Sequence, residues 1–298
     1  MNLNYIYYFS VLAKTQHYTK AANILNITQP SLSHAIDEIE KELGCLLFEK
    51  DGRNIKLTKY GKLLESHVET GLKELEAGQR EIQYLMSPNE GLIKLAFIYT
   101  LGYSFVPNVL KNFHTIPTNK QINFSLKQGN TTEILDGLEN EKYDLCFSSY
   151  QNNRNNICFV PIMIEELVVV VYDGHPLSEK KEVDLSELVD ENLIYYSKTS
   201  GLRPFIDKLL NDNNIKPNIK FEVEEDSAVL GLVNIKYGIA IVPNILIIDN
   251  FNVKKLKIKN KQDPRYIYMA TIKNRFEAPA ISKFINFITS YYAIKNKA

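Results

Sequence analysis

The first 45 residues contain three apolar runs at helical spacing, separated by residues that favour helix ends. A helix is predicted over residues 2–16, and a second over residues 19–25 with Thr19 as its N-cap. A third begins after Thr28, whose hydroxyl can also cap a helix, and Asn26 between them can take the left-handed conformation that ends one. The face that the first helix turns inward is predicted to consist of Leu3, Ile6, Phe9 and Leu12.

The third predicted helix separates an apolar face from a polar one. Pro30 falls in its first turn, where a missing N–H costs nothing. Its inward positions are Leu32, Ala35, Ile36, Ile39 and Leu43. Its outer face near the N-terminus carries Gln29, Ser31, Ser33 and His34. Two short helices with such a face are typical of a helix-turn-helix that reads the DNA major groove, although an ordinary helical hairpin of some core has the same pattern.

Residues 45–58 are predicted to form a two-stranded wing with a turn at Asp51-Gly52. Basic residues on and after this hairpin are placed as a phosphate-gripping wing requires. The residues expected to contact DNA are Thr19, Thr28, Gln29, Pro30, Ser31, Ser33, His34, Lys50, Arg53, Asn54 and Lys56.

A long helix is predicted over residues 59–86, capped by Thr58. Its apolar residues repeat at spacings of three and four, which is the pattern of a helix that buries a stripe. The stripe can pack within its own chain or against a second copy, and two reading heads on DNA favour the second copy. The dimerisation residues predicted on this basis are Leu64, Val68, Leu72, Leu75, Ile82 and Met86.

From Leu92 onward, eight short apolar strands alternate with helices, the first over residues 92–98 and the last over 266–271. This alternation predicts an α/β fold, and the length predicts two lobes. Polar residues follow several strands, at the edge where such folds bind ligands. The residues predicted on this basis to bind a ligand, which the resemblance described below implies is an effector, are Thr100, Gln128, Gly129, Asn130, Thr131, Ser148, Ser149, Ser197, Thr199, Ser200 and Arg203. Hydroxyls, amides and a guanidinium suit a small organic acid, although the same residues also cap helices.

The segment from Tyr8 to Leu64 resembles the LysR-type transcriptional regulators. The matching positions are Phe9, Ala21, Ala22, Leu25, Thr28, Gln29, Ser33, Ile36, Glu40, Leu43, Gly44, Leu47, Phe48, Leu57, Thr58 and Gly61. The resemblance is looser from Gly91 to Pro107, at Tyr143-Asp144-Leu145 and around Gly238.

This resemblance implies an N-terminal all-α winged helix-turn-helix with a long linker helix, followed by an α/β two-lobed effector domain like periplasmic binding proteins. The expected domains are a DNA-binding domain over 1–58, a linker and dimerisation helix over 59–88, and an effector-binding domain over 89–298. Lobe I is expected at about 91–161 and 266–298, and lobe II at about 162–265. The partners implied are an inverted-repeat site in double-stranded DNA, a small-molecule effector, a homodimer or homotetramer, and RNA polymerase.

Two positions depart from the family pattern. His34 stands where members usually carry Arg on the reading helix, so the base preference there differs, because imidazole donates more weakly and titrates. Ile98 replaces a Ser that contacts effector in many members, which indicates a different or more apolar ligand. Cys146 and Cys158 invite comparison with the family's peroxide-responding members, but their apolar surroundings favour core cysteines.

Composition sets limits on the class of protein. The 298 residues have a formal net charge of zero, which argues against a protein that coats nucleic acid indiscriminately. The sequence shows no apolar run or leader typical of membrane or exported proteins, and its three cysteines suit a reducing cytoplasm. No metal-ligand spacing, phosphate loop or nucleophile motif is present, so we expect no metal, no cofactor and no enzyme activity. The alternative function is a solute-binding or enzymatic α/β protein with a helical interaction module.

Overall fold

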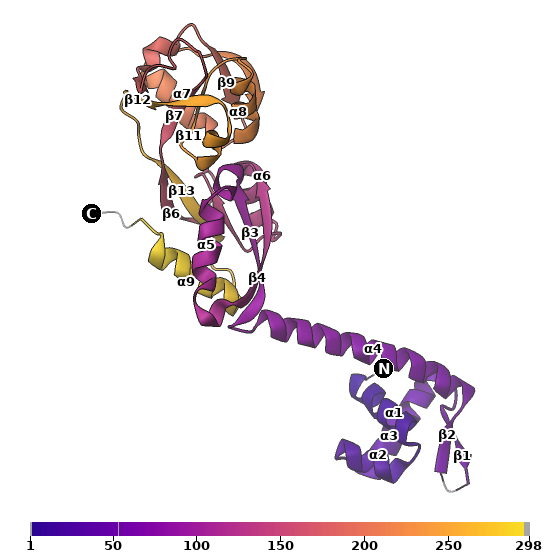
Figure 1. Ribbon diagram of the computed structural model, residues 1–298. Coiled ribbons are helices and arrows are strands. Elements are labelled where there is room, and N and C mark those ends of the chain that lie inside the picture. The colour runs from indigo at the N-terminus through magenta and orange to yellow at the C-terminus, as the bar shows by residue number, and fades with distance from the viewer. Residues whose placement is uncertain (1, 53, 295–298) are drawn as a thin grey trace. The chain divides into compact units, whose positions relative to one another are not determined.

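The computed structural model describes residues 2–52 and 54–294, which divide into two compact units between residues 84 and 85 (Figure 1). The first unit contains α1 (Leu3–Thr15), α2 (Tyr18–Leu25), α3 (Gln29–Leu43), the antiparallel hairpin β1 (Phe48–Asp51) and β2 (Asn54–Leu57), and nearly all of α4 (Lys59–Leu85). It is a winged helix-turn-helix continued by a long helix, as the sequence predicted.

Apolar residues from all three short helices and both wing strands form the core of the first unit. Phe9, Leu12 and Leu32 are completely buried there. Two residues predicted to face inward do not, because Leu3 is 60% exposed and Leu43 is 42% exposed at the ends of their helices. The N-cap of α2 is His17, whose ring accepts from the Lys20 N–H, so the prediction that Thr19 caps this helix was wrong.

The helix α4 has two halves with different surroundings. Its start is capped by Thr58, whose hydroxyl accepts from the Gly61 N–H at 3.0 Å. Val68 is buried in the winged-helix core of its own chain, with Leu64 and Leu72 packed against that core. Leu75 and Ile82 are more than half exposed. Packing within the chain therefore accounts for the first three predicted seam residues and leaves the later ones on the surface.

The second unit has two lobes. Lobe I is built on a five-stranded sheet in the order β4-β3-β5-β13-β6, in which β3 runs parallel to β4 and β5 while β13 runs antiparallel to β5 and β6. Helices α6 and α9 pack against it. Its elements are β3 (Glu90–Ile98), η1 (Tyr99–Gly102), α5 (Phe105–His114), η2 (Pro117–Asn119), β4 (Gln121–Gly129), α6 (Thr131–Glu139), β5 (Leu145–Ser148), β6 (Ile157–Glu165), β13 (Arg265–Ile272) and α9 (Pro279–Tyr291).

Lobe II contains a four-stranded sheet in the order β11-β7-β12-β8 and the parallel pair β9-β10. Its central strand β7 reads LVVVVY and is buried along nearly its whole length, as β-branched residues in the middle of a sheet should be. The elements are β7 (Leu167–Tyr172), β8 (Glu182–Val183), η3 (Leu185–Leu188), β9 (Asn192–Tyr196), α7 (Arg203–Asp212), β10 (Asn218–Val223), α8 (Asp226–Asn234), β11 (Ala240–Pro243), η4 (Leu246–Asn250) and β12 (Val253–Ile258).

The chain passes between the lobes twice, after β6 and before β13. These strands pair with each other from Glu165 and Arg265 to Ile157 and Ile272. Strands β6, β8 and β12 were not among the predicted strands. The segment before β6 is rich in Asn, and Pro161 lies inside that strand, where sequence signals argue against a regular strand.

Candidate functional site

The N-terminus of α3 presents the predicted DNA-reading residues on the surface of the first unit. Thr28 caps the helix by accepting from the Ser31 N–H at 3.3 Å, with Pro30 in the first turn. The predicted residues Thr19, Thr28, Gln29, Pro30, Ser31 and His34 are exposed, and Ser33 is half-buried. This surface has the shape and polarity that a reading helix needs to enter a major groove.

The side chain of Gln29 is held by the preceding helix. The Thr19 hydroxyl donates to Gln29 Oε1 at 3.2 Å. With its oxygen engaged, the amide presents its NH₂ group, which is a donor for acceptors on base edges.

The wing is attached to the reading helix through Glu40, a contact that sequence reasoning missed. Glu40 Oε1 accepts from the backbone N–H groups of Leu47 and Phe48, at 2.6 and 3.2 Å. Burial and the charges of Glu40 and Asp37 raise the pKa of Tyr18 to about 12. Glu40 therefore faces the protein and ties the wing to α3.

The wing carries the exposed residues Lys50, Asn54 and Lys56. Lys56 lies within 3.5 Å of Glu49 and 4.0 Å of Asp51, so part of its charge is neutralised inside the hairpin. Arg53, which was predicted at the tip, lies outside the described residues.

The cleft between the lobes is assembled at one edge of the lobe I sheet. Because β3, β4 and β5 are parallel, their carboxyl ends meet at that edge. Thr100 follows the first of these strands, Thr131 the second and Ser149 the third. All three line the cleft.

Contacts across the cleft hold the lobes together. The Thr100 hydroxyl donates to Asp226 Oδ2 at 3.0 Å, and Tyr103 donates to Glu225 at 3.4 Å. Gly201 of lobe II packs so closely on Thr131 and Ser149 of lobe I that an added methyl group would overlap both. The free space among the lining groups is about 20 Å³, which is room for about one water molecule and not for a metabolite.

Asp226 at the start of α8 is the buried carboxylate of the cleft. It accepts from the hydroxyls of Thr100 and, at 2.5 Å, Tyr196. Burial raises its pKa, and the two hydrogen bonds oppose that rise. Burial and the charge of Asp226 raise the pKa of Tyr196 in turn, so the phenol stays a donor.

Arg265 is the buried cation of the cleft. It is 2% exposed, donates to Ser149 Oγ at 2.9 Å and forms an ion pair with the buried Glu165. Burial lowers the pKa of Arg265 to about 9, which still leaves it charged at neutral pH. Sequence reasoning missed this residue because it began the last strand at Tyr266.

Six of the predicted effector-binding residues line the cleft, and five do not. Those that line it are Thr100, Gly129, Asn130, Thr131, Ser149 and Ser200. Asn130 caps α6 by accepting from the Glu133 N–H at 2.9 Å. The Thr131 hydroxyl is buried and, within the described part of the chain, has no hydrogen-bond partner.

The five that lie elsewhere are Gln128, Ser148, Ser197, Thr199 and Arg203. Ser197 and Thr199 bond to each other at 2.8 Å, at the surface of lobe II. Arg203 was predicted as the guanidinium for a carboxylate, but it pairs with Asp207 and Glu222 and lies over the ring of Tyr195 at 4.4 Å. The charge of Arg203 is therefore paired within lobe II, and the guanidinium that lines the cleft is that of Arg265.

The two cysteines considered for redox chemistry differ. Cys146 is buried, and burial raises the pKa of its thiol, which suppresses the reactive thiolate. Cys158 is exposed on β6, so the expectation that it lies in the core was wrong. Within residues 2–52 and 54–294, no cluster of three His, Cys, Asp or Glu side chains could hold a metal ion. Over the same ranges no helix combines the length and apolarity needed to cross a membrane.

A winged helix-turn-helix followed by a two-lobed ligand-binding domain defines the class of ligand-responsive DNA-binding regulators. Residues 3–62 match the family model described as bacterial regulatory helix-turn-helix protein, lysR family, and residues 87–293 match the LysR substrate binding domain. The chain belongs to the LysR family of transcriptional regulators, as the resemblance implied.

Relatives extend over nearly the whole chain. The HTH-type transcriptional regulator YybE of Bacillus subtilis is 36% identical over 286 residues, 96% of this chain and 97% of YybE. The transcriptional dual regulator GltC of the same organism is 28% identical over 297 residues, 98% of both chains.

Two solved structures are similar in fold. The effector binding domain of QuiR in complex with shikimate is 44% identical, with a TM-score of 0.67 over 68% of this chain and 97% of that domain. Full-length CbnR in complex with its target DNA is 22% identical, with a TM-score of 0.62 over 97% of this chain and 99% of CbnR. The CbnR likeness concerns the fold.

Proposed function

We propose that the effector of this regulator is a small hydroxylated carboxylic acid held between the lobes. The observation that carries the proposal is the buried, unpartnered hydroxyl of Thr131 within the described residues, at the N-terminus of α6 and across the cleft from Asp226. A helix N-terminus favours an anion, since its free N–H groups and dipole point at the ligand.

The opposite wall of the cleft suits hydroxyl groups. Asp226 and Glu224 are acceptors there, and they would repel a ligand that carried only carboxylates. A carboxylate at α6 with hydroxyls toward Asp226 satisfies both walls. Shikimate, the ligand of the 44% identical QuiR domain, combines one carboxylate with several hydroxyls.

The chain is further proposed to act as a cytoplasmic homodimer or homotetramer on an inverted-repeat site, without enzyme activity. The exposed half of α4 supports pairing, because Leu75 and Ile82 would otherwise leave large apolar surfaces in water. Ile82→Glu should raise the dimer dissociation constant at least about tenfold in sedimentation experiments, because a buried unpaired charge is costly. The exposed control Lys73→Glu should leave the dissociation constant unchanged. Equal effects of the two substitutions would contradict pairing through the exposed half of α4.

A gel-shift titration tests the proposed function as a whole. DNA from beside the protein's own gene, which should contain an inverted repeat, is titrated with the protein at low salt, where phosphate contacts are strongest. Shikimate or a related hydroxy acid should change the affinity or the pattern of protection. Failure to bind any local inverted repeat would contradict the proposal for DNA, and binding that no hydroxy acid alters would contradict the effector class.

A further inference from the structure

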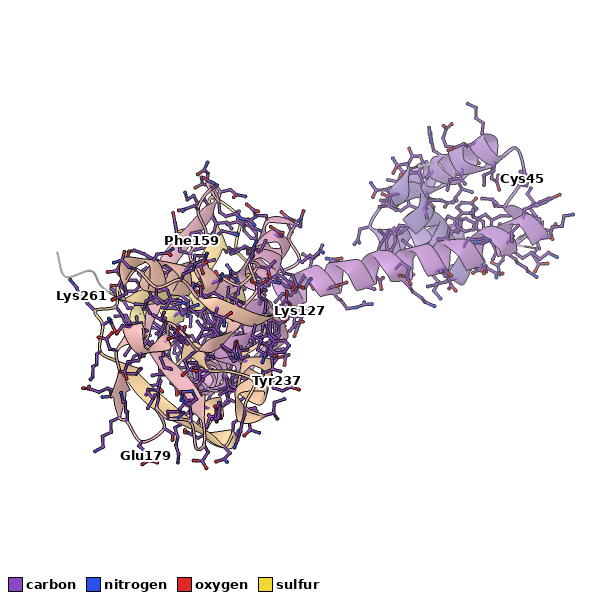
Figure 2. The ribbon with its side chains drawn as sticks, turned by 90° about the horizontal axis from the view of Figure 1, so that it is seen from above. Cys45, Lys127, Phe159, Glu179, Tyr237 and Lys261 are labelled. Atoms are coloured by element: carbon purple, nitrogen blue, oxygen red, sulfur yellow. The ribbon has the colours of Figure 1, made fainter. Side chains whose placement is uncertain are left out.

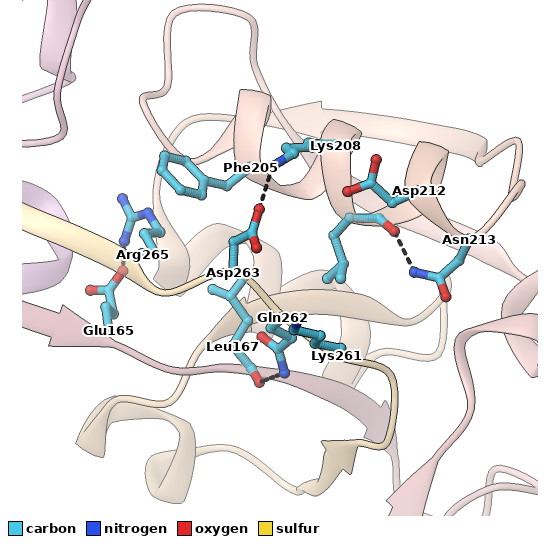
Figure 3. Close-up of a pocket in the computed structure, with 11 residues that line it drawn as sticks. Glu165, Leu167, Phe205, Lys208, Asp212, Asn213, Lys261, Gln262, Asp263 and Arg265 are labelled. Atoms are coloured by element: carbon cyan, nitrogen blue, oxygen red, sulfur yellow. Dashed lines mark hydrogen bonds and ion pairs between the residues drawn. The ribbon is translucent and has the colours of Figure 1, made fainter.

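A second hollow lies in the second unit, and Arg265 lines both this hollow and the cleft (Figure 3). Its volume is about 330 Å³, against about 20 Å³ for the cleft. Small-molecule sites in proteins typically begin at about 300 Å³. The hollow therefore has room for a metabolite without any separation of the lobes.

The floor of the hollow is buried and its wall is partly apolar. The Glu165–Arg265 ion pair forms one end, with both side chains no more than 4% exposed. The ring of Phe205 lies over the Arg265 guanidinium at 5.8 Å, and Leu167 and Leu209 complete the apolar lining. An apolar group entering here would bury surface against Phe205 and Leu209.

Most polar groups of the hollow are already engaged. Lys208 on α7 pairs with Asp263, and the Asn213 amide donates to the Leu209 carbonyl at 2.8 Å while its oxygen accepts from Asn260 at 2.8 Å. Gln262 donates to the Leu167 carbonyl at 3.5 Å. These contacts fix the walls and leave few groups to recognise a ligand.

Two opposite charges on the rim remain available. Asp212 ends α7, and Lys261 lies on the loop that leads into β13, so that they face the hollow from the helix and from the loop (Figure 3). Within the described ranges neither side chain forms a hydrogen bond or a close ion pair, although Asp212 interacts electrostatically with Lys208, and Lys261 with Asp263. Lys261 is exposed at the surface of the unit (Figure 2), where a ligand arriving from solvent can reach it.

We propose that this hollow is a second binding site, which takes a zwitterionic α-amino acid with an apolar side chain. The carboxylate pairs with Lys261, the ammonium pairs with Asp212, and the side chain packs on Phe205. The ionisable side chains of the lining balance, with three acidic (Glu165, Asp212, Asp263) and three basic (Lys208, Lys261, Arg265), which favours a ligand of zero net charge. This site is separate from the one proposed for the hydroxy acid.

Arg265 links the two sites. One side of its guanidinium contacts Glu165 in the hollow, and the other donates to Ser149 in the cleft. A ligand packed against Phe205 and Arg265 stabilises this arrangement, which exists when the lobes are together. By linkage, each ligand then changes the affinity for the other by the same factor.

Isothermal titration of the full-length protein with L-phenylalanine and L-leucine tests the site. Saturable binding by at least one is expected. When the same measurement uses 2-phenylethylamine and 3-phenylpropanoate, which each lack one charge, affinity should be at least about tenfold lower than for L-phenylalanine. The proposal would be overturned if either analogue bound as tightly as L-phenylalanine, or if neither amino acid showed saturable binding.

Variants locate the bound amino acid. Lys261→Met and Asp212→Asn should each weaken binding at least about tenfold, since each removes one charge-assisted contact. The exposed Lys216→Met, outside the hollow, and the cleft variant Thr131→Val should bind as the wild type does. If Thr131→Val lost amino-acid binding while Lys261→Met and Asp212→Asn kept it, the amino acid would lie in the cleft, and the assignment to the hollow would be overturned. The amino acid should also change the affinity of a cleft ligand about fivefold or more, and unchanged affinity would overturn the link through Arg265.

Discussion

The hydroxyl of Thr100 in lobe I donates a 3.0 Å hydrogen bond to Asp226 in lobe II. This bond joins η1, the turn that follows β3 of lobe I, to the first residue of α8 in lobe II. Tyr196 donates to the other oxygen of the same carboxylate. Lobe closure therefore brings donors from both lobes to one buried acid. A substitution that holds the lobes apart should therefore weaken effector binding.

Gly201→Ala should hold the lobes apart. The added methyl group would overlap the Thr131 hydroxyl and the Ser149 side chain, so closure around an effector is strained. We expect at least about a tenfold loss of effector affinity in isothermal titration, because a strained contact of this kind costs about 1–3 kcal/mol. Gly231→Ala is the control, since no atom of the described residues outside the helix itself and its chain neighbours lies within 4 Å of a methyl group there. Equal affinity of the two variants would show that Gly201 does not control closure.

Asp226→Asn should change how stability depends on pH. Burial raises the pKa of Asp226, so the folded protein binds this proton more tightly than the unfolded chain. The contribution of this group to the free energy of unfolding therefore falls as pH rises from about 4 through the raised pKa, and is constant above it. Urea unfolding between pH 4 and 7 should show the wild type gaining stability relative to the variant as pH falls.

Other carboxylates do not obscure this comparison. The pKa values of Asp184, Glu187 and Asp263 are lowered by hydrogen bonds, which gives the opposite slope, but it is the same slope in both proteins. A wild-type-minus-variant difference that stays constant with pH would contradict the buried, proton-linked state of Asp226.

Glu40→Ala should loosen the wing. The backbone N–H groups of Leu47 and Phe48 lose their acceptor, and unsatisfied part-buried donors cost about 1–3 kcal/mol. The midpoint temperature at which the first unit unfolds should fall, and the affinity for DNA should fall as well. Glu40→Gln keeps one acceptor oxygen and should recover part of the loss. If the alanine variant binds DNA like the wild type, the wing is held by other contacts.

Thr19→Val should alter base preference and leave the affinity for nonspecific DNA unchanged. Without the Thr19 hydroxyl the Gln29 amide can rotate, so discrimination at its base pair should relax, as in Gln29→Ala, by up to about 1–3 kcal/mol. Arg53→Ala should instead weaken all sequences alike and lower the salt slope by about one. Binding assays across single-base variants of the site at two salt concentrations separate these effects. Uniform weakening by Thr19→Val would mean that Gln29 does not read a base.

The sequence predicted best where local rules decide the structure. Thr28 caps α3 and Asn26 takes a positive φ of 53°, as predicted from their residue types. The parallel strands β3, β4 and β5 brought Thr100, Thr131 and Ser149 together, because strand ends in a parallel sheet share one edge. These predictions needed no knowledge of distant contacts.

Predictions that depend on contacts between distant segments were less successful. Arg265 reaches the cleft because β13 runs antiparallel to β5, so that its first residue lies beyond the end of that strand, and neither pairing nor register is visible in one sequence. Arg203 looked equally suitable but meets Asp207 one helical turn later. Likewise, the stripe of α4 runs from Leu64 to Met86 in the sequence with Gln79 as its one polar position, while the winged helix covers Val68 and leaves Ile82 exposed.

The most direct test is a calorimetric titration of shikimate and related hydroxy acids into the wild type, Thr131→Val and Thr132→Val. Thr131 lines the cleft with a hydroxyl that has no hydrogen-bond partner among the described residues, whereas its neighbour Thr132 accepts from Gln151 at 3.2 Å and lies outside the cleft. We predict saturable binding by the wild type and by Thr132→Val, and an affinity at least about tenfold lower for Thr131→Val, because the ligand carboxylate loses a charge-assisted hydrogen bond. Binding that Thr131→Val leaves intact, or stabilisation only by cationic or purely apolar compounds, would contradict a hydroxylated carboxylate as the effector.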